Sequence, residues 1–171
     1  MRKRKIYQSM QTKKPLTGQQ AYSRLTTLCA RSEHCQHDML EKMRLWGVPQ
    51  EEQSAVMDRL VGERYVDDER FTRAFVRDKV RYGKWGRRKI EQALWQKRID
   101  SELASSVLDE VDDDEYLAVL KPLLSQKLKN IRASSHRDMQ ARLVRFAMSR
   151  GFTMDIIRQC VDNADEDEFL D

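Results

Sequence analysis

The sequence predicts an all-α protein, an elongated tandem array of three three-helix repeats that resemble helix-turn-helix units. Apolar residues recur at helical spacing along most of the 171 residues. No run rich in Val, Ile and Thr alternates with period two, so we expect no strands. One pattern of helix ends also occurs three times along the chain. Because each repeat buries only a thin core and packs on its neighbour, we expect an elongated monomer.

The first repeat is predicted over residues 19–65, after a polar and basic tail at 1–18 that is expected to be disordered. Its helices should begin near Gln19, near His34 and just beyond Pro49, since proline suits the start of a helix. Apolar residues at helical spacing predict its core. They are Tyr22, Leu25, Leu28, Cys29, Met39, Leu40, Met43, Trp46, Val56, Met57 and Leu60.

The second helix of each repeat ends just before an apolar residue, namely Val48, Ile99 or Phe152, and these residues are 51 and 53 positions apart. Placing them in register predicts equivalent cores in all three repeats. Three sets of positions then superpose: Met39 with Ile90 and Leu143, Met43 with Leu94 and Ala147, and Val56 with Val107 and Cys160. The remaining predicted boundaries are 66–111 for the second repeat, 112–164 for the third and 165–171 for an acidic tail.

An acidic helix start separates the first and second repeats. Asp67, Asp68 and Glu69 suit the first turn of a helix, where carboxylates face unpaired N–H groups and the positive end of the helix dipole. Similar runs, Val111 to Tyr116 and Ala164 to Phe169, follow the other two repeats. Capping is the plain interpretation of all three. Tyr65 and Phe71 bracket the first of these runs and are predicted to pack between the first two repeats.

A basic turn follows the helix that begins at this acidic start. Gly83 is predicted to take the left-handed conformation that closes the helix, and Gly86 to relax the backbone before the next one. That next helix opens with Arg87, Arg88 and Lys89. Positive charge at a helix N-terminus opposes the dipole, which hints at an anionic partner. The alternative is a solvated surface on which Glu91 and nearby acids neutralise these cations.

Basic residues are concentrated in two segments, although the net charge is only +4. Residues 79–98 hold eight cations against one acid, and residues 121–150 hold eight against one. Such segments suit a polyanion or an acidic protein surface, but a basic helix face is often only solvated. The candidate binding residues are Arg77, Arg81, Lys84, Arg87, Arg88 and Lys89 in the second repeat, and Lys127, Lys129, Arg132, Arg142 and Arg145 in the third.

Several function classes are not expected from this sequence. No apolar run is long enough to span a membrane, and no secretory signal follows the basic N-terminus, so we expect a cytoplasmic protein. The three cysteines form no disulfide framework, and the spacing of Cys29, His34, Cys35 and His37 does not suit zinc. The sequence contains no phosphate-binding glycine loop, and adjacent carboxylates at a helix start point apart. We therefore expect no cofactor, no metal and no catalytic site.

Several of these features together resemble the RecX family, the bacterial proteins that modulate the recombinase RecA. The resemblance covers about residues 21–162. It rests chiefly on the motif Tyr65-Val66-Asp67-Asp68-Glu69-Arg70-Phe71 and on the spacing of Gly83, Gly86, Arg87, Ile90 and Leu94. Two departures are visible: Arg64 stands where the family usually has Gly, and Trp85 and Arg87 alter the commoner turn.

The resemblance implies a protein of tandem three-helix repeats that lodges in the groove of the RecA filament. It would restrain ATP hydrolysis, strand exchange and the stimulated cleavage of the SOS repressor, with weak, salt-sensitive contacts to single- or double-stranded DNA. Two alternatives remain. One is a stand-alone DNA-binding protein of the helix-turn-helix type. The other is a nuclease that uses Asp67, Asp68 and Glu69 around a metal ion.

Overall fold

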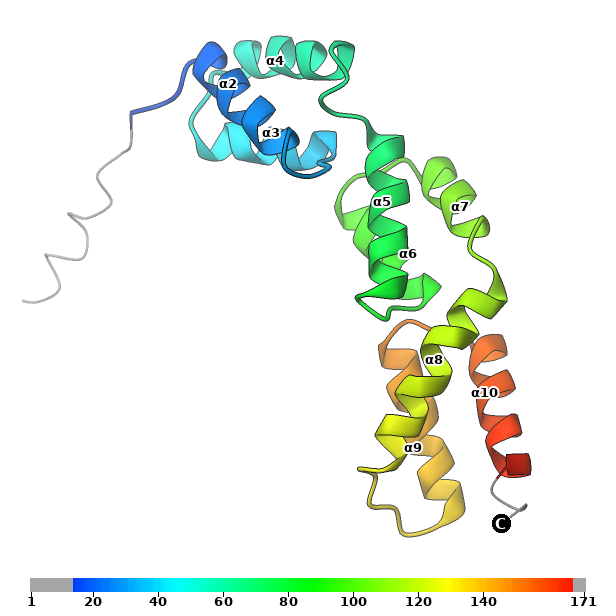
Figure 1. The fold of residues 1–171 in the computed structure, drawn as a ribbon. Coiled ribbons are helices and arrows are strands. Elements are labelled where there is room, and N and C mark those ends of the chain that lie inside the picture. The colour runs from blue at the N-terminus through cyan, green and yellow to red at the C-terminus, as the bar shows by residue number, and fades with distance from the viewer. Residues whose placement is uncertain (1–13, 168–171) are drawn as a thin grey trace, which may run out of the picture. The chain divides into compact units, whose positions relative to one another are not determined.

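The computed structural model describes residues 14–167, with side chains for residues 14–161. Within these residues the chain forms nine α-helices and no strand (Figure 1), so the predicted all-α class is confirmed. The chain divides into two compact units, Met1–Phe71 and Thr72–Asp171. The helices are α2 (Gly18–Cys29), α3 (Gln36–Leu45), α4 (Gln50–Gly62), α5 (Asp68–Arg81), α6 (Arg87–Gln96), α7 (Ser101–Asp109), α8 (Asp113–Leu128), α9 (His136–Ser149) and α10 (Met154–Asp167).

Helices α2, α3 and α4 form the first three-helix group, in which α4 packs on both of the others. The helices begin where their sequences offer caps: Thr17 and Gln20 form a capping box at the start of α2, and Pro49 precedes α4. Six of the eleven predicted core residues are buried. The other five are only partly buried and pack against the core: Tyr22, Leu28, Cys29, Leu40 and Trp46. The core consists of Ala21, Leu25, Met39, Met43, Val48, Val56, Met57, Leu60 and Val66.

The second compact unit holds most of α5 and all of α6 to α10. Within it α6 packs on α7, and α8, α9 and α10 lie side by side (Figure 1). Its buried residues include Val76, Val80, Ile90 and Leu94 from the second group of helices. Tyr116, Leu120, Leu143, Phe152 and Ile157 are buried in the third. None of the helices within residues 14–167 combines the length and the apolar character that a membrane span needs.

The predicted register of the repeats is confirmed by the turns that end α3, α6 and α9. Gly47, Arg98 and Gly151, the equivalent residues of these turns, have positive φ angles of 70°, 57° and 89°. The next residue in each case donates its N–H to the carbonyl five positions earlier: Val48 to Met43 at 3.0 Å, Ile99 to Leu94 at 3.1 Å and Phe152 to Ala147 at 3.2 Å. Each helix therefore ends in the same left-handed cap.

The predicted role of Gly83 is wrong. The residue with positive φ after α5 is Lys84, at 54°, and the N–H of Trp85 closes the turn on the carbonyl of Lys79 at 3.0 Å. A Cβ on Gly83 would lie 2.8 Å from that same carbonyl oxygen. Glycine is therefore needed for this close approach, and a lysine accepts the left-handed position.

Gly86 does not relax the backbone as predicted, because it lies in a tight contact with the third repeat. Its φ of −83° is open to any residue, but a Cβ there would overlap with the backbone of Gly151 and Phe152. The Gly86 N–H donates to the carbonyl of Arg150 at 2.8 Å, and the Arg88 N–H donates to that of Gly151 at 3.0 Å. We call this contact the Gly86–Gly151 clasp. It joins the start of α6 to the turn between α9 and α10.

Candidate partner-binding surface

Two acidic residues of the Tyr65–Phe71 motif, Asp67 and Asp68, cap helices. The carboxylate of Asp67 accepts the backbone N–H of Arg70 at 2.9 Å and caps α5 itself. Asp68 instead reaches the first group of helices, where it accepts the backbone N–H of Gln36 at 2.8 Å and the side-chain amide of Gln36 at 3.2 Å. Since Gln36 is the first residue of α3, one short acidic run caps two helices.

Arg70 connects the same motif to two further segments of the first compact unit. Its guanidinium lies 2.6 Å from the carboxylate of Glu33 and 3.1 Å from the carbonyl of Arg64. The hydrogen bond to Glu33 raises the pKa of Arg70. Arg64 has a positive φ of 60°, so the turn that Arg70 supports is one where glycine would fit more easily. The motif therefore has a structural role, because it holds these segments of the first unit together.

Tyr65 and Phe71 differ in their environments. Phe71 is buried, with 6% of its surface exposed, whereas Tyr65 is 39% exposed. The Tyr65 ring meets that of Tyr22 edge to face at 6.3 Å between centroids. Val66, next to Tyr65, is the buried residue that precedes the acidic run. Phe71 is therefore buried and Tyr65 is only partly covered, while the packing of both rings between the first two repeats stays a prediction.

Within the residues that the structure describes, the side chains proposed for a metal-dependent nuclease do not form a metal site. Among all the described residues, no three His, Cys, Asp or Glu side chains gather closely enough to hold a metal ion. Burial raises the pKa of the Cys29 and Cys160 thiols, which opposes formation of the reactive thiolate. Asp67 and Asp68 point to different partners, so they do not converge on one ion.

Several of the candidate binding cations already have partners in the fold. Arg87, at the start of α6, lies 2.6 Å from the carboxylate of Asp109 at the end of α7. Arg77 lies at the looser distance of 4.0 Å from Asp78. Lys89 lies 4.6 Å from the ring centre of Trp85. The favourable Arg87–Asp109 contact offsets part of the cost of placing an arginine at a helix N-terminus.

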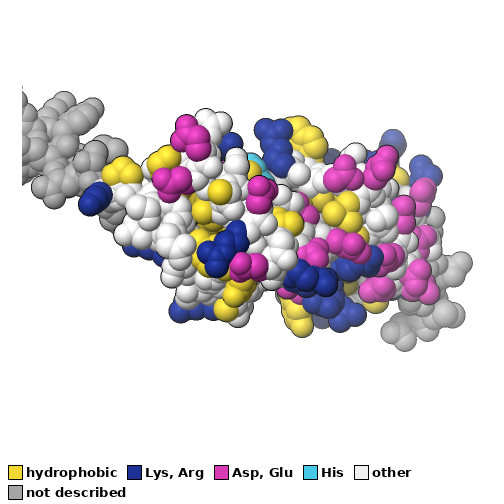
Figure 2. Space-filling model, turned by 90° about the horizontal axis from the view of Figure 1, so that it is seen from above, with side chains coloured by type: hydrophobic (Ala, Val, Ile, Leu, Met, Phe, Trp, Pro, Cys, Tyr) yellow, Lys and Arg dark blue, Asp and Glu magenta, His cyan; other side chains and the backbone are white. Residues whose placement is uncertain are grey.

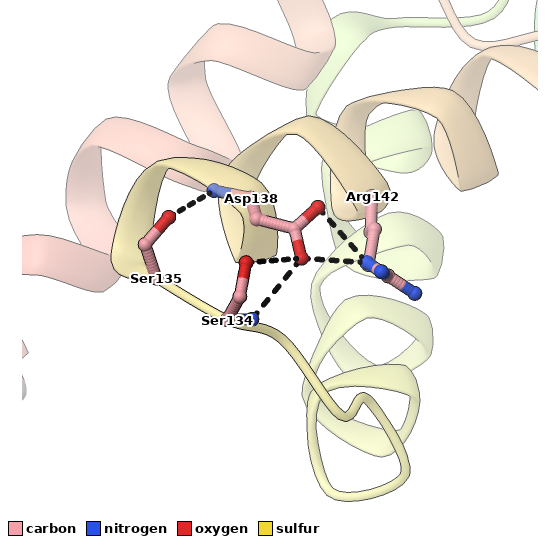
Figure 3. A network of polar contacts seen from close by, with 4 residues as sticks. All are labelled: Ser134, Ser135, Asp138 and Arg142. Carbon is pink, nitrogen blue, oxygen red and sulfur yellow. Dashed lines mark hydrogen bonds and ion pairs between the residues drawn. The ribbon is translucent and has the colours of Figure 1, made fainter.

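Two candidate cations of the third repeat also have partners within the fold. Lys127 lies 5.1 Å from the ring centre of Phe146. Figure 3 shows Arg142 bound to Asp138, with its Nε 3.1 Å from each carboxylate oxygen. Asp138 also accepts the N–H of Ser134 at 3.2 Å, and its own N–H donates to Ser135 at 3.1 Å. The hydrogen bond from Arg142 lowers the pKa of Asp138, which favours the ionised carboxylate in this network at the start of α9.

The other six candidate cations are exposed, and none makes an ion pair with a residue that the structure describes. We call them the unpaired cations. Three belong to the second repeat and three to the third, so each basic segment contributes equally. They are Arg81, Lys84, Arg88, Lys129, Arg132 and Arg145. Because no described residue forms an ion pair with them, they can contact an anionic partner without breaking an ion pair in residues 14–161.

A basic stretch of sequence does not become a uniformly basic surface. On the face drawn in Figure 2, acidic and basic side chains lie next to each other, with hydrophobic side chains between them. Near the basic helix α5, for example, Arg73 pairs with Glu110 from the end of α7. Sequence counts alone therefore overstate the positive field, and the unpaired cations are the better guide to a partner contact.

Sequence reasoning missed the exposed apolar residues. Trp95 on α6 is 70% exposed, Met148 on α9 is 47% exposed and Tyr82 after α5 is 81% exposed. A signal was present, because Trp95 follows the buried Leu94 directly and so falls off the inward stripe of its helix. Leu45 on α3, at 83% exposure, is a fourth example.

Comparisons with known proteins identify the family. Residues 67–108 match the family model described as RecX, second three-helix domain, and residues 113–161 match RecX, third three-helix domain. The chain is 30% identical to the "Regulatory protein RecX" of Acinetobacter baylyi, over 95% of this chain and 99% of that protein. It is 27% identical to that of Chromobacterium violaceum, over 90% of this chain and 97% of that protein.

Two solved structures share the fold. The crystal structure of RecX from Lactobacillus salivarius superposes with a TM-score of 0.77 at 18% identity, covering 86% of this chain and 96% of that one. A second, titled as a crystal structure of regulatory protein RecX, gives 0.78 at 20% identity, covering 85% and 73%. Together with the three-helix family models, they confirm an array of three-helix repeats. The chain belongs to the RecX family of regulatory proteins.

Proposed function

We propose that this chain binds the RecA nucleoprotein filament and inhibits its ATPase, strand-exchange and co-protease activities in recombination and SOS repair. The observation that carries the proposal is the 30% identity to a regulatory protein RecX over 95% of the chain. The chain would act as a cytoplasmic monomer, without cofactor or catalysis. The predicted boundaries at residues 18, 65, 111 and 164 would mark its three repeats, and the elongated form of the array stays a prediction.

The unpaired cations supply the chemistry for such a contact. An ionised partner group makes hydrogen bonds about twice as strong as neutral ones, and exposed arginines suit carboxylates and phosphates equally. RecA residues and the phosphates of filament DNA are therefore both available partners. In this proposal, DNA contacts assist filament binding and are weak and salt-sensitive. The paired cations Arg77, Arg87, Lys89, Lys127 and Arg142 are secondary candidates for this contact, because each already has a neighbour within the fold.

The competing function is a stand-alone DNA-binding protein of the helix-turn-helix type. Its support is the presence of three unpaired cations, Arg81, Lys84 and Arg88, around the start of α6. That protein would bind duplex DNA sequence-specifically and leave RecA unaffected. A fluorescence-anisotropy titration with several duplex sequences at two salt concentrations separates the two functions.

The deciding experiment measures the single-strand-dependent ATPase of RecA with substoichiometric amounts of this protein. We expect inhibition below one molecule per RecA, because one extended array would span neighbouring subunits of the filament. An unchanged ATPase rate at equimolar protein, with intact RecA filaments, contradicts the proposal. Sequence-specific duplex binding together with that result would favour the alternative.

A charge-reversal pair tests the surface within the same assay. Arg88→Glu changes an unpaired cation of α6, while Arg158→Glu makes the same charge change on an exposed residue of α10. Arg88→Glu should slow the onset of inhibition and flatten its salt dependence, since interface charges act mainly on association rate. Arg158→Glu should behave as the parent. Equal behaviour of both variants at low and high salt would show that Arg88 is only a solvated residue.

A further inference from the structure

Trp95 and Met148 occupy the same position in two consecutive repeats. Each lies three residues before the left-handed residue that ends its helix, Arg98 in the second repeat and Gly151 in the third. Both are exposed, at 70% and 47% of their surfaces. One exposed apolar side chain on a protein surface is ordinary. The same exposure at equivalent positions of α6 and α9 is a repeated feature, and neither residue gains helix propensity over a charged one.

Polar groups surround these two side chains in a way that suits a protein contact. On α6, Gln92 lies three residues before Trp95, and the unpaired Arg88 lies two turns before it. On α9, the unpaired Arg145 lies three residues before Met148. Residues three, four or seven apart share one helix face, so each apolar side chain stands beside an available hydrogen-bond donor.

The Gly86–Gly151 clasp links the two helices that carry these residues. It joins the first turn of α6 to the turn that ends α9, through two backbone hydrogen bonds of 2.8 and 3.0 Å. Both repeats also belong to one compact unit. The first repeat differs, because its equivalent residue is Arg44, which pairs with Glu41 on its own helix. The repeated feature is therefore confined to the second and third repeats.

We infer that Trp95 and Met148 are the two apolar anchors of a protein-docking surface, whose partner presents apolar pockets rimmed by acidic groups. The inference rests on the proposed function, and the partner is then the protein component of the RecA filament. Trp, Met and Arg are enriched in the cores of protein interfaces, where a few such anchors carry most of the binding energy. Arg88 and Arg145 supply the charge complementarity to the acidic rim.

A nucleic-acid contact fits these residues less well. Bases stack on aromatic rings, and Met148 offers a thioether instead of a ring. A protein pocket accepts both a tryptophan and a methionine.

The test compares Trp95→Ala, Met148→Ala and the double variant with the parent in the RecA ATPase assay. Leu45→Ala is the matched control, since Leu45 is exposed, apolar and near the end of the equivalent helix of the first repeat. We expect Trp95→Ala to raise the half-inhibitory concentration on the order of tenfold, as for an anchor residue. Met148→Ala should raise it less, the double variant more, and Leu45→Ala should match the parent. Thermal melts should coincide because all these side chains are exposed.

Each other outcome has a defined meaning. If the parent inhibits RecA and the double variant inhibits equally well, the docking surface is overturned while the proposed function stands. If the parent has no effect on RecA, both fail. The double variant can also be tested for binding to a labelled oligonucleotide. If its oligonucleotide affinity falls by the same factor as its inhibition of RecA, the residues contact nucleic acid and the protein-docking inference is wrong. Should Trp95→Ala melt early, Trp95→Gln, with a side chain closer in size, replaces it.

Discussion

Replacing Gly86 by alanine should disrupt the clasp between the second and third repeats. The φ and ψ of Gly86, −83° and 168°, are available to alanine, so backbone strain is not the problem. The added Cβ would instead overlap with backbone atoms of Gly151 and Phe152, which cannot rotate away as a flexible side chain can. The two backbones must separate, and the clasp must open.

The cost follows from what that separation breaks. Two backbone hydrogen bonds are lost, each contributing about 1 kcal/mol. Forcing an extra carbon into a packed contact costs a further 1 to 3 kcal/mol, roughly. The Gly86→Ala variant should therefore unfold with a free energy about 3 to 5 kcal/mol below that of the parent. This is a large part of the roughly 5 to 15 kcal/mol that stabilises most domains.

Urea denaturation, followed by the helix signal of circular dichroism at about 222 nm, measures this loss in the free energy of unfolding. Gly62→Ala is the matched control, because no atom lies within 4 Å of the Cβ position at Gly62 and the residue is in α4. That variant should gain up to about 1 kcal/mol from helix propensity. A Gly86→Ala variant within about 1 kcal/mol of the parent would refute the steric reasoning, since a real overlap cannot cost so little.

Two further predictions concern aromatic rings. Phe71→Ala should lower the free energy of unfolding by about 3 to 5 kcal/mol because Phe71 is buried. Tyr65→Ala should lower it by only about 1 kcal/mol, through loss of its exposed edge-to-face contact. Equal losses for the two variants in urea denaturation would contradict this reasoning. Burial raises the pKa of Tyr116 from 10.0 to about 12, so the folded state keeps a proton that the unfolded state loses. The free energy of unfolding should therefore stay level below pH 10 and fall as the pH rises from 10 to 12. Tyr116→Phe should remove this alkaline loss of stability. The variant should be as stable as the parent at about pH 7, because the buried Tyr116 hydroxyl has no hydrogen-bond partner among the described residues. A clear loss at neutral pH would show that the hydroxyl is hydrogen-bonded.

Local patterns were enough to predict the helices and the register of the repeats. Leu94 and Met43 are fully buried at the positions that the spacing predicted, and the left-handed residues recur at the predicted interval. These features depend on neighbours within a few residues, because burial at helical spacing and helix capping are local properties. The acidic start of α5 was predictable for the same reason.

Contacts between distant segments could not be predicted in this way. Asp68 caps α3 through Gln36, which lies 32 positions away in the sequence, and Arg87 pairs with Asp109, which lies 22 positions away. Gly86 looked like an ordinary turn glycine because its neighbour in space, Gly151, lies in another repeat. The division of the cations into paired and unpaired ones depends on such contacts. A count of charges along the chain therefore could not show which cations are already paired with acids in the fold.

The three tryptophans occupy different environments and give the protein a set of built-in optical reporters. Trp46 packs against the core of the first unit near Arg24, Trp85 lies between 4 and 5 Å from the ammonium groups of Lys79 and Lys89, and Trp95 faces solvent. Variants that keep one tryptophan at a time would separate their emission. Iodide should quench Trp95 strongly, and the nearby lysines should shift the emission of Trp85. Titration with RecA filaments would then show, without any attached dye, which of the three environments a partner changes.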